Sequence, residues 1–70
     1  MPIFRVVDLR SMTITPEYNV EENSPERAAE IALGMRVFRS GDRRNLVCRV
    51  YWQSRHGLNM VRLYRQTDEL

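Results

Sequence analysis

The sequence of 70 residues contains no lysine, one cysteine, one histidine and only three glycines. The lone Cys48 excludes an internal disulfide, and its place in the apolar run Leu46-Val47-Cys48 predicts a buried structural thiol. No apolar stretch approaches membrane-spanning length, and no apolar leader follows Met1-Pro2. Together with the unpaired cysteine, these features predict a cytoplasmic protein with no membrane partner.

The sequence also lacks the motifs of common enzyme classes. It has no glycine-rich phosphate loop, no zinc-ligand spacing and no nucleophile motif. Gly34, Gly41 and Gly57 suit a helix end and two turns, and His56 has no metal-ligating neighbour at a suitable spacing. We therefore expect a non-enzymatic protein with no catalytic residues, no metal site and no cofactor.

The length of the chain suits one domain, which we place at residues 1–70 with a polar tail at 66–70. The hydrophobic fraction of 43% is that of a globular protein. So small a core leaves little net stability. A homodimer that covers one face of the fold is therefore one expectation.

All eleven basic residues are arginines, and they are unevenly distributed. Residues 1–34 hold three arginines and six acidic residues, whereas residues 35–65 hold eight arginines and one acidic residue, Asp42. A GC-rich genome would explain the missing lysine but not where the arginines lie. Arginine forms bidentate contacts with phosphate or carboxylate and stacks on rings, so the second half of the chain suits an anionic partner.

Two strands and a helix are expected in the first half. Residues 3–9 are apolar and β-branched, and apolar residues alternate with polar ones over 12–20, where a proline indicates an edge strand or a bulge. Ser24 is a good helix N-cap, Pro25 suits the first helical position, and Gly34 suits the left-handed residue that ends many helices.

In the second half an arginine-aliphatic-aromatic triplet recurs every 13 residues, as Arg36-Val37-Phe38, Arg49-Val50-Tyr51 and Arg62-Leu63-Tyr64. Thirteen residues is about one strand plus a short turn. The repeat predicts three consecutive antiparallel strands, at 35–39, 46–53 and 60–65. Because alternate side chains point to opposite faces of a strand, each arginine and ring should share one face and each aliphatic residue should lie on the other.

The last two strands should form a hairpin through residues 55–58, with Ser54 opposite Asn59. The resulting register places Trp52 opposite Val61, Val50 opposite Leu63, Tyr51 opposite Arg62 and Arg49 opposite Tyr64. The fold class is therefore α+β, a small antiparallel sheet (strand-strand-helix-strand-strand-strand) with one helix packed on one face. The expected core comprises Leu46, Cys48, Val50, Trp52, Val61, Leu63, Val37, Met12, Ile14, Tyr18, Val20, Ile31 and Leu33.

The arginine-and-ring face is the best indication of function. One interpretation is a platform for RNA or single-stranded DNA, or for an acidic protein surface, with rings stacking on bases and guanidiniums meeting phosphates. A second is that arginine–tyrosine pairs only stabilise a solvated sheet face. A third is a structural or regulatory protein interface, including a homodimer. The candidate face comprises Arg36, Phe38, Arg49, Tyr51, Arg62 and Tyr64, and the candidate rim comprises Arg39, Arg43, Arg44, Arg55 and Arg65.

Overall fold

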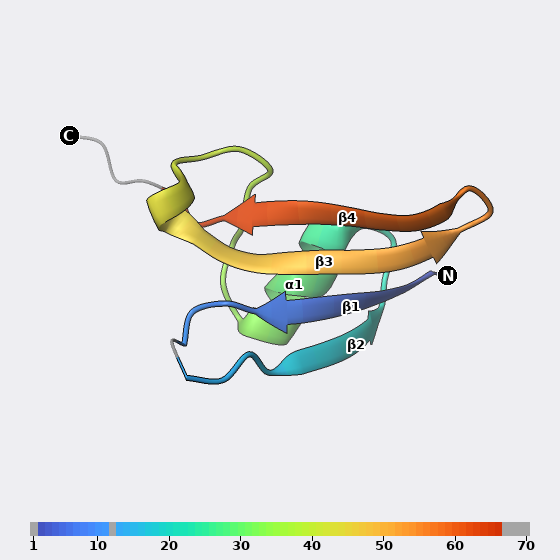
Figure 1. The fold of residues 1–70 in the computed structure, drawn as a ribbon, viewed down its shortest axis with the longest axis horizontal. Helices are drawn as coiled ribbons and strands as arrows, with labels where there is room; N and C mark the ends of the chain where they lie inside the picture. The colour runs from blue at the N-terminus through green and yellow to red at the C-terminus, as the bar shows by residue number, and fades with distance from the viewer. Residues whose placement is uncertain (1, 12, 67–70) are drawn as a thin grey trace.

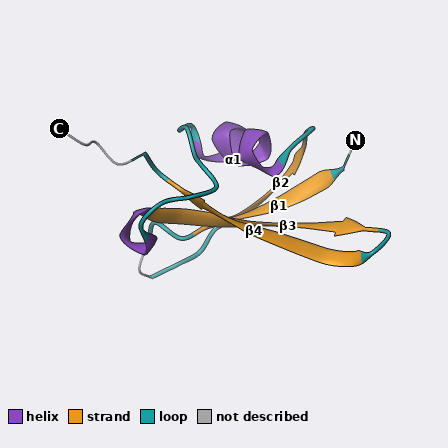
Figure 2. Cartoon of the chain, turned by 90° about the horizontal axis from the view of Figure 1, so that it is seen from above, coloured by secondary structure: helices purple, strands orange, loops and turns teal. Residues whose placement is uncertain are grey.

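The computed structural model describes residues 2–11 and 13–66. Four strands form one antiparallel sheet in the order β2-β1-β3-β4, and the helix α1 lies across one face of it (Figure 1, Figure 2). The expected α+β class, with a helix on one face of an antiparallel sheet, is confirmed. The elements are β1 (Ile3–Asp8), β2 (Glu17–Glu21), α1 (Pro25–Leu33), the 3-10 turn η1 (Arg43–Asn45), β3 (Leu46–Ser54) and β4 (Gly57–Tyr64).

The helix α1 begins and ends at the residues that its sequence predicts. The Ser24 hydroxyl accepts a hydrogen bond from the backbone N–H of Arg27 at 3.1 Å, and Pro25 occupies the first turn, where its missing N–H costs nothing. Gly34 closes the helix with a φ of 69°, and its N–H donates to the carbonyl of Glu30 at 2.9 Å. The small side chains of Ala28 and Ala29 are fully buried, which brings the helix close to the sheet.

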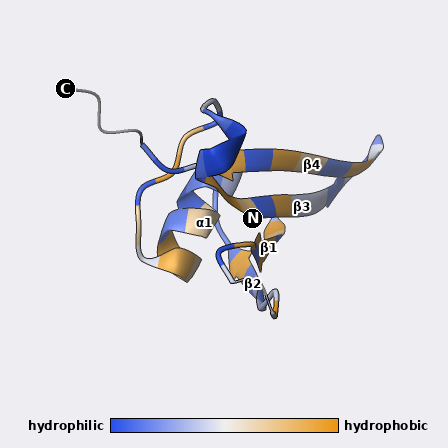
Figure 3. Ribbon diagram, turned by 60° about the vertical axis from the view of Figure 1, so that its left-hand side comes forward, coloured by the Kyte–Doolittle hydropathy of each residue, from blue (hydrophilic) through white to orange (hydrophobic). Residues whose placement is uncertain are grey.

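The core lies between α1 and the sheet and is built mainly from β1, β3 and β4. Val6, Val50 and Leu63 are fully buried there, and the Phe4 ring meets the Trp52 ring edge-on at 5.3 Å. Figure 3 shows that β3 and β4 both mix apolar and polar residues, and along β4 the less and the more exposed positions alternate. This alternation turns one face of the sheet toward the helix and leaves the other face open.

Residues 35–39 do not form the strand that was expected. Only Phe38 pairs with the sheet, through an isolated bridge to Tyr64 at the end of β4. The segment has to cross from the end of α1 to the outer edge of β4, and Val37 is buried in the core on the way. This crossing leaves only one bridge, so the strand expected at residues 35–39 is wrong and the sheet has four strands among the described residues.

The expected hairpin between β3 and β4 exists, but its register differs by two residues. A two-residue turn at 55–56 joins the strands, so that Ser54 pairs with Gly57 and Trp52 with Asn59. The expected Ser54–Asn59 pairing survives only as a side-chain hydrogen bond of 3.0 Å. A shift by two residues preserves which face each side chain occupies, so the expected alternation holds.

The N-terminal half also departs from expectation. The strand expected over 12–20 begins only at Glu17, because Pro16 has no N–H to donate to a ladder. Of the expected core residues, Ile14 is 66% exposed, Ile31 is 55% exposed and Tyr18 is 41% exposed, and Met12 lies outside the described residues. Ile31 follows Ala29 by two residues, which places it on roughly the opposite side of the helix.

Candidate functional site

The open face of the sheet, opposite α1, carries alternate residues of β1, β3 and β4. Pairing puts Arg5 of β1, Tyr51 of β3 and Met60 of β4 in one row across the strands. Val7, Arg49 and Arg62 form the next row. The buried residues between them in sequence, Val50 and Leu63 among others, face the helix instead. We call Arg5, Arg49, Tyr51 and Arg62 the open-face cluster.

Two arginines contact the ring of Tyr51 within this cluster. The Arg5 guanidinium lies 5.0 Å from the ring centroid, a distance at which the positive charge interacts with the ring face. Nη1 of Arg49 lies 3.4 Å from the Tyr51 hydroxyl and donates a hydrogen bond to it. The ring is thus held by its neighbours while remaining half-exposed on the open face.

Arg49 and Arg62 lie directly opposite each other on β3 and β4. Like charges in such cross-strand positions repel and destabilise a sheet. Within residues 2–11 and 13–66 neither arginine has an acidic partner, whereas Arg5 lies 3.8 Å from a carboxylate oxygen of Glu17. The two arginines therefore present uncompensated positive charge beside a half-buried aromatic ring.

The remaining candidate face residues form a separate group at the end of β4. Phe38 bridges to Tyr64, and the Arg36 guanidinium lies 5.9 Å from the Phe38 ring centroid. The backbone at Gly41 packs against Tyr64 so closely that a Cβ at that position would lie 2.8 Å from the Tyr64 Cβ. This contact covers part of the Tyr64 side chain.

The arginines of the candidate rim differ in whether they contact an acidic or polar side chain. The Arg39 guanidinium forms an ion pair with Glu26 of α1, and Arg44 pairs with Asp42 at 3.4 Å in the turn before β3. Nε of Arg65 donates to the amide oxygen of Asn45 at 3.1 Å. Two other rim arginines, Arg43 in η1 and Arg55 in the hairpin turn, are exposed.

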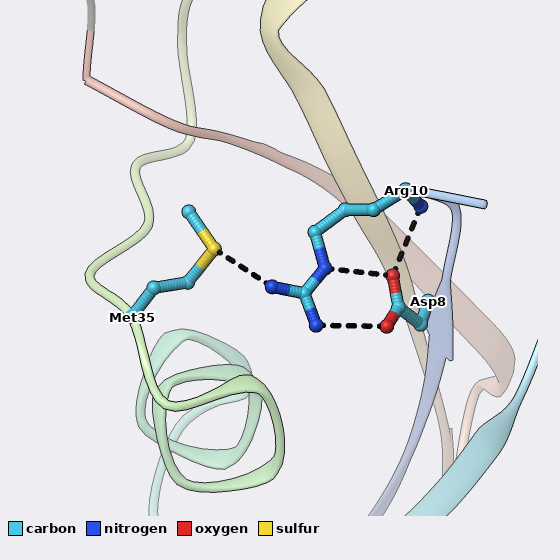
Figure 4. Close-up of polar contacts among 3 residues, drawn as sticks. All are labelled: Asp8, Arg10 and Met35. Carbon is cyan, nitrogen blue, oxygen red and sulfur yellow. Dashed lines mark hydrogen bonds and ion pairs between the residues drawn. The ribbon is translucent and has the colours of Figure 1, made fainter.

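A buried carboxylate, that of Asp8, lies at the end of β1. It accepts three hydrogen bonds from Arg10, from the backbone N–H at 2.9 Å, from Nε at 3.0 Å and from Nη2 at 2.9 Å, while Nη1 of Arg10 reaches the sulfur of Met35 at 3.5 Å (Figure 4). The hydrogen bonds from Arg10 lower the pKa of Asp8, and the carboxylate raises the pKa of Arg10 in return. This pair links β1 to the segment that follows α1, and its charges are already satisfied.

Cys48 lies opposite Asp8 on β3 and is fully buried, as the sequence predicts. Burial, together with the negative charge of Asp8, raises the pKa of the Cys48 thiol to about 11. A thiol that stays protonated at neutral pH is a weak nucleophile, so its role here is packing.

Other kinds of site find little support in the described residues. In the described part of the chain, no three His, Cys, Asp or Glu side chains gather to hold a metal ion. A shallow pocket of about 220 Å³ beside Phe38, Gly41 and Arg65 is smaller than usual small-molecule sites, which run from roughly 300 to 1,000 Å³. Over residues 2–11 and 13–66, no helix has both the length and the apolar character that crossing a membrane requires.

Comparison of the chain with family models, with curated proteins and with solved structures gave no match. The assignment of function therefore rests on the geometry of the open face.

The structure brings together only part of the candidate face and adds one residue to it. Arg49, Tyr51 and Arg62 are neighbours on the open face, whereas Arg36, Phe38 and Tyr64 lie at its end. Arg5 completes the cluster because β1 pairs directly with β3. The strand at 3–9 was expected from its composition, but nothing in the sequence indicates which strand lies beside it.

Proposed function

We propose that this protein is a small non-enzymatic module that binds single-stranded nucleic acid, RNA or DNA, on the open-face cluster. The observation that carries the proposal is the cross-strand pair of Arg49 and Arg62, which lacks an acidic partner within the described residues. In the free protein this pair costs stability. A phosphate group between the two guanidiniums would relieve the repulsion and accept charge-assisted hydrogen bonds from both.

Tyr51 supplies the second element of such a site. Proteins that bind single strands combine basic groups along the backbone with aromatic rings on which bases stack. The half-exposed Tyr51 ring lies next to the Arg49–Arg62 row, with Arg5 against it at 5.0 Å. One ring and a neighbouring pair of arginines suit a base and its adjacent phosphate. No base-reading group is required, so we propose binding with little sequence preference.

An interface with another protein is the second candidate function, and a different observation favours it. Leu58 is 65% exposed and Met60 is 40% exposed, and both belong to the open side of β4. Apolar residues on a surface indicate a protein contact more than a nucleic-acid contact. Met60 shares a cross-strand row with Arg5 and Tyr51, so a partner that covers Met60 would lie beside the open-face cluster.

The nucleic-acid proposal is tested by fluorescence anisotropy with labelled single-stranded oligonucleotides at 50 and 200 mM salt. Two or three phosphate contacts predict a loss of affinity of about tenfold between these concentrations as counterions are released. Arg62→Ala should weaken binding at low salt by about tenfold, because one charge-assisted hydrogen bond is lost. It should also make the slope of the logarithm of the association constant against the logarithm of the salt concentration shallower by about 0.7.

Arg27→Ala is the matched control, since Arg27 is an exposed arginine on α1, on the other side of the sheet. Removing it changes the net charge equally but should leave both affinity and salt slope nearly unchanged. Thermal unfolding provides a second readout, because Arg62→Ala removes a like-charge pair and should keep or raise the melting temperature. Equal losses from the two variants, or no binding at 50 mM salt, would count against the proposal.

A further inference from the structure

The outer edge of β4 has backbone groups that point away from the sheet. The N–H of Tyr64 donates to the carbonyl of Phe38 and the N–H of Phe38 donates to the carbonyl of Tyr64, each at 2.8 Å, so the peptide groups of Tyr64 face away from β3. Successive residues of a strand direct these groups to opposite edges. The N–H and C=O groups of Arg62, Met60 and Leu58 therefore face the same outer edge as those of Tyr64.

This edge is open over the stretch from Leu58 to Arg62. Within residues 2–11 and 13–66, β4 pairs with β3 on its inner side, and only Phe38 pairs on its outer side. Figure 1 shows β4 at the border of the sheet, and the loop after α1 pairs with it through Phe38 at Tyr64, the last residue of the strand. The side chains along the open stretch are largely apolar, and Arg62 is its one charged residue.

The opposite edge of the sheet is shielded by comparison. β2 is only five residues long, follows Pro16 and carries Glu17 and Glu21 at its two ends. Short length, proline and charge are the usual devices that prevent an edge strand from pairing with another chain. β4 has eight residues and no proline. An added strand is therefore expected at β4 and not at β2.

Met60 lies midway along the open stretch of β4. The stretch is bounded by the hairpin turn at 55–56 on one side and by the Phe38–Tyr64 bridge on the other. An antiparallel strand placed along it with Met60 opposite Met60 would put Leu58 opposite Arg62 at both ends. Every outward N–H and C=O of Leu58, Met60 and Arg62 would then find a partner.

We propose that a second copy of this chain binds along the outer edge of β4, with a two-fold axis at Met60. A second copy brings the same open edge, so one pairing satisfies the outward groups of both chains, which favours this partner over an unrelated peptide. Each Arg62 lies opposite Leu58 of the second copy, so the two Arg62 residues are four positions apart, roughly 13 Å along the strands. Met60, 40% exposed in one copy, then lies beside Met60 of the other, and Leu58, 65% exposed, lies beside the Arg62 side chain of the other copy.

Disulfide trapping tests the register directly. In an antiparallel hydrogen-bonded pair the Cα atoms are about 5.5 Å apart, within the range of about 4.4–6.8 Å that a disulfide needs. Met60→Cys should therefore give a cross-linked dimer in high yield under mild oxidation. Leu58→Cys is the matched control, because two copies of residue 58 would be roughly 13 Å apart and should not cross-link. The buried Cys48 of the unmodified chain should not cross-link either.

Sedimentation of the full chain tests whether the contact lies along β4. The unmodified protein should sediment at twice its monomer mass of 8.3 kDa at sufficient concentration. Met60→Lys places two like charges side by side at the two-fold axis and should raise the dimer dissociation constant at least tenfold. Ile3→Lys adds the same charge to an open-face residue of β1 that is 61% exposed, and should leave the dimer intact.

Circular dichroism of each variant establishes that it is folded before its mass is interpreted. Monomers at millimolar concentration, larger open-ended assemblies, cross-linking through residue 58 or equal effects of the two lysine variants would each overturn the proposal. The inference does not depend on nucleic-acid binding, because all of these measurements are made on the protein alone.

Discussion

At the scale of single residues, Asp8 is the core residue that most needs its hydrogen-bond partners. It is the buried charged residue among the described residues, and its carboxylate depends on the three hydrogen bonds from Arg10. Removing one member of such an arrangement leaves the other without its partner. Loss of Arg10 would therefore leave the buried Asp8 carboxylate without these hydrogen bonds.

Acid should weaken the fold through this residue. The pKa of Asp8 is lowered in the folded protein, first by the hydrogen bonds from the Arg10 side chain, so its contribution to stability is present above the ordinary value of 3.8 and is lost as the pH falls through the lowered value. We expect Asp8→Asn to cost about 1–3 kcal/mol at pH 7, and to flatten the fall of unfolding free energy below about pH 4. Urea unfolding at several pH values measures both effects.

Asp42→Asn is the control for the acid effect. The pKa of Asp42 is also lowered, first by the backbone N–H and then by the side chain of Arg44, but this carboxylate is exposed in the turn before β3. Solvent screens its interactions, so its substitution should change the pH dependence less than that of Asp8. An equal change from both variants would contradict the role assigned to Asp8.

At the scale of elements, the helix α1 depends on its first cap. Ser24→Ala removes the hydroxyl that accepts from the backbone N–H of Arg27 and should cost about 1 kcal/mol. For a domain of this size, that loss corresponds to a melting temperature lower by roughly 4–8 °C. The neighbouring Asn23→Ala changes a side chain that makes no capping contact in α1, and should leave the melting temperature nearly unchanged. Thermal unfolding followed by circular dichroism compares the two variants.

The helix and the hairpin show how far local sequence determines an element. Ser24, Pro25 and Gly34 act through the backbone next to them, so their effect is readable without knowing the rest of the fold. The triplets behave similarly, since Val37, Val50 and Leu63 are all buried as alternation requires. The segment 35–39 has the same local pattern but becomes a single bridge, because its course is set by where α1 ends and where β4 lies.

At the scale of the whole molecule, the reactivity of Cys48 toward a thiol reagent reports how often the core unfolds. Cys48 is the only thiol in the chain, it is fully buried, and its pKa is raised to about 11. We expect a thiol reagent at pH 8 to label the native protein roughly a hundredfold more slowly than the denatured protein, because labelling requires exposure of the core. The time course of labelling, with and without denaturant, measures this ratio. Fast labelling of the native protein would mean that β3 opens locally.

The open-face cluster is likewise a property of the whole molecule. Arg49, Tyr51 and Arg62 could be predicted as neighbours because the hairpin that joins them is local and its parity survives a shift of two residues. Arg5 could not, because it joins them only through the pairing of β1 with β3, between segments more than forty positions apart. Phe4 and Val6 were missed as core residues for the same reason, since β1 is an inner strand of the sheet.

The contrast between the two borders of the sheet has a consequence for stoichiometry. Once a second copy pairs with β4, the outer edges that remain among the described strands are those of β2, where Pro16, Glu17 and Glu21 disfavour further pairing. Strand addition would therefore stop after a single step instead of propagating into a fibril. A chain with one sheet edge that can pair and one that disfavours pairing can associate through backbone hydrogen bonds and still stop at a dimer.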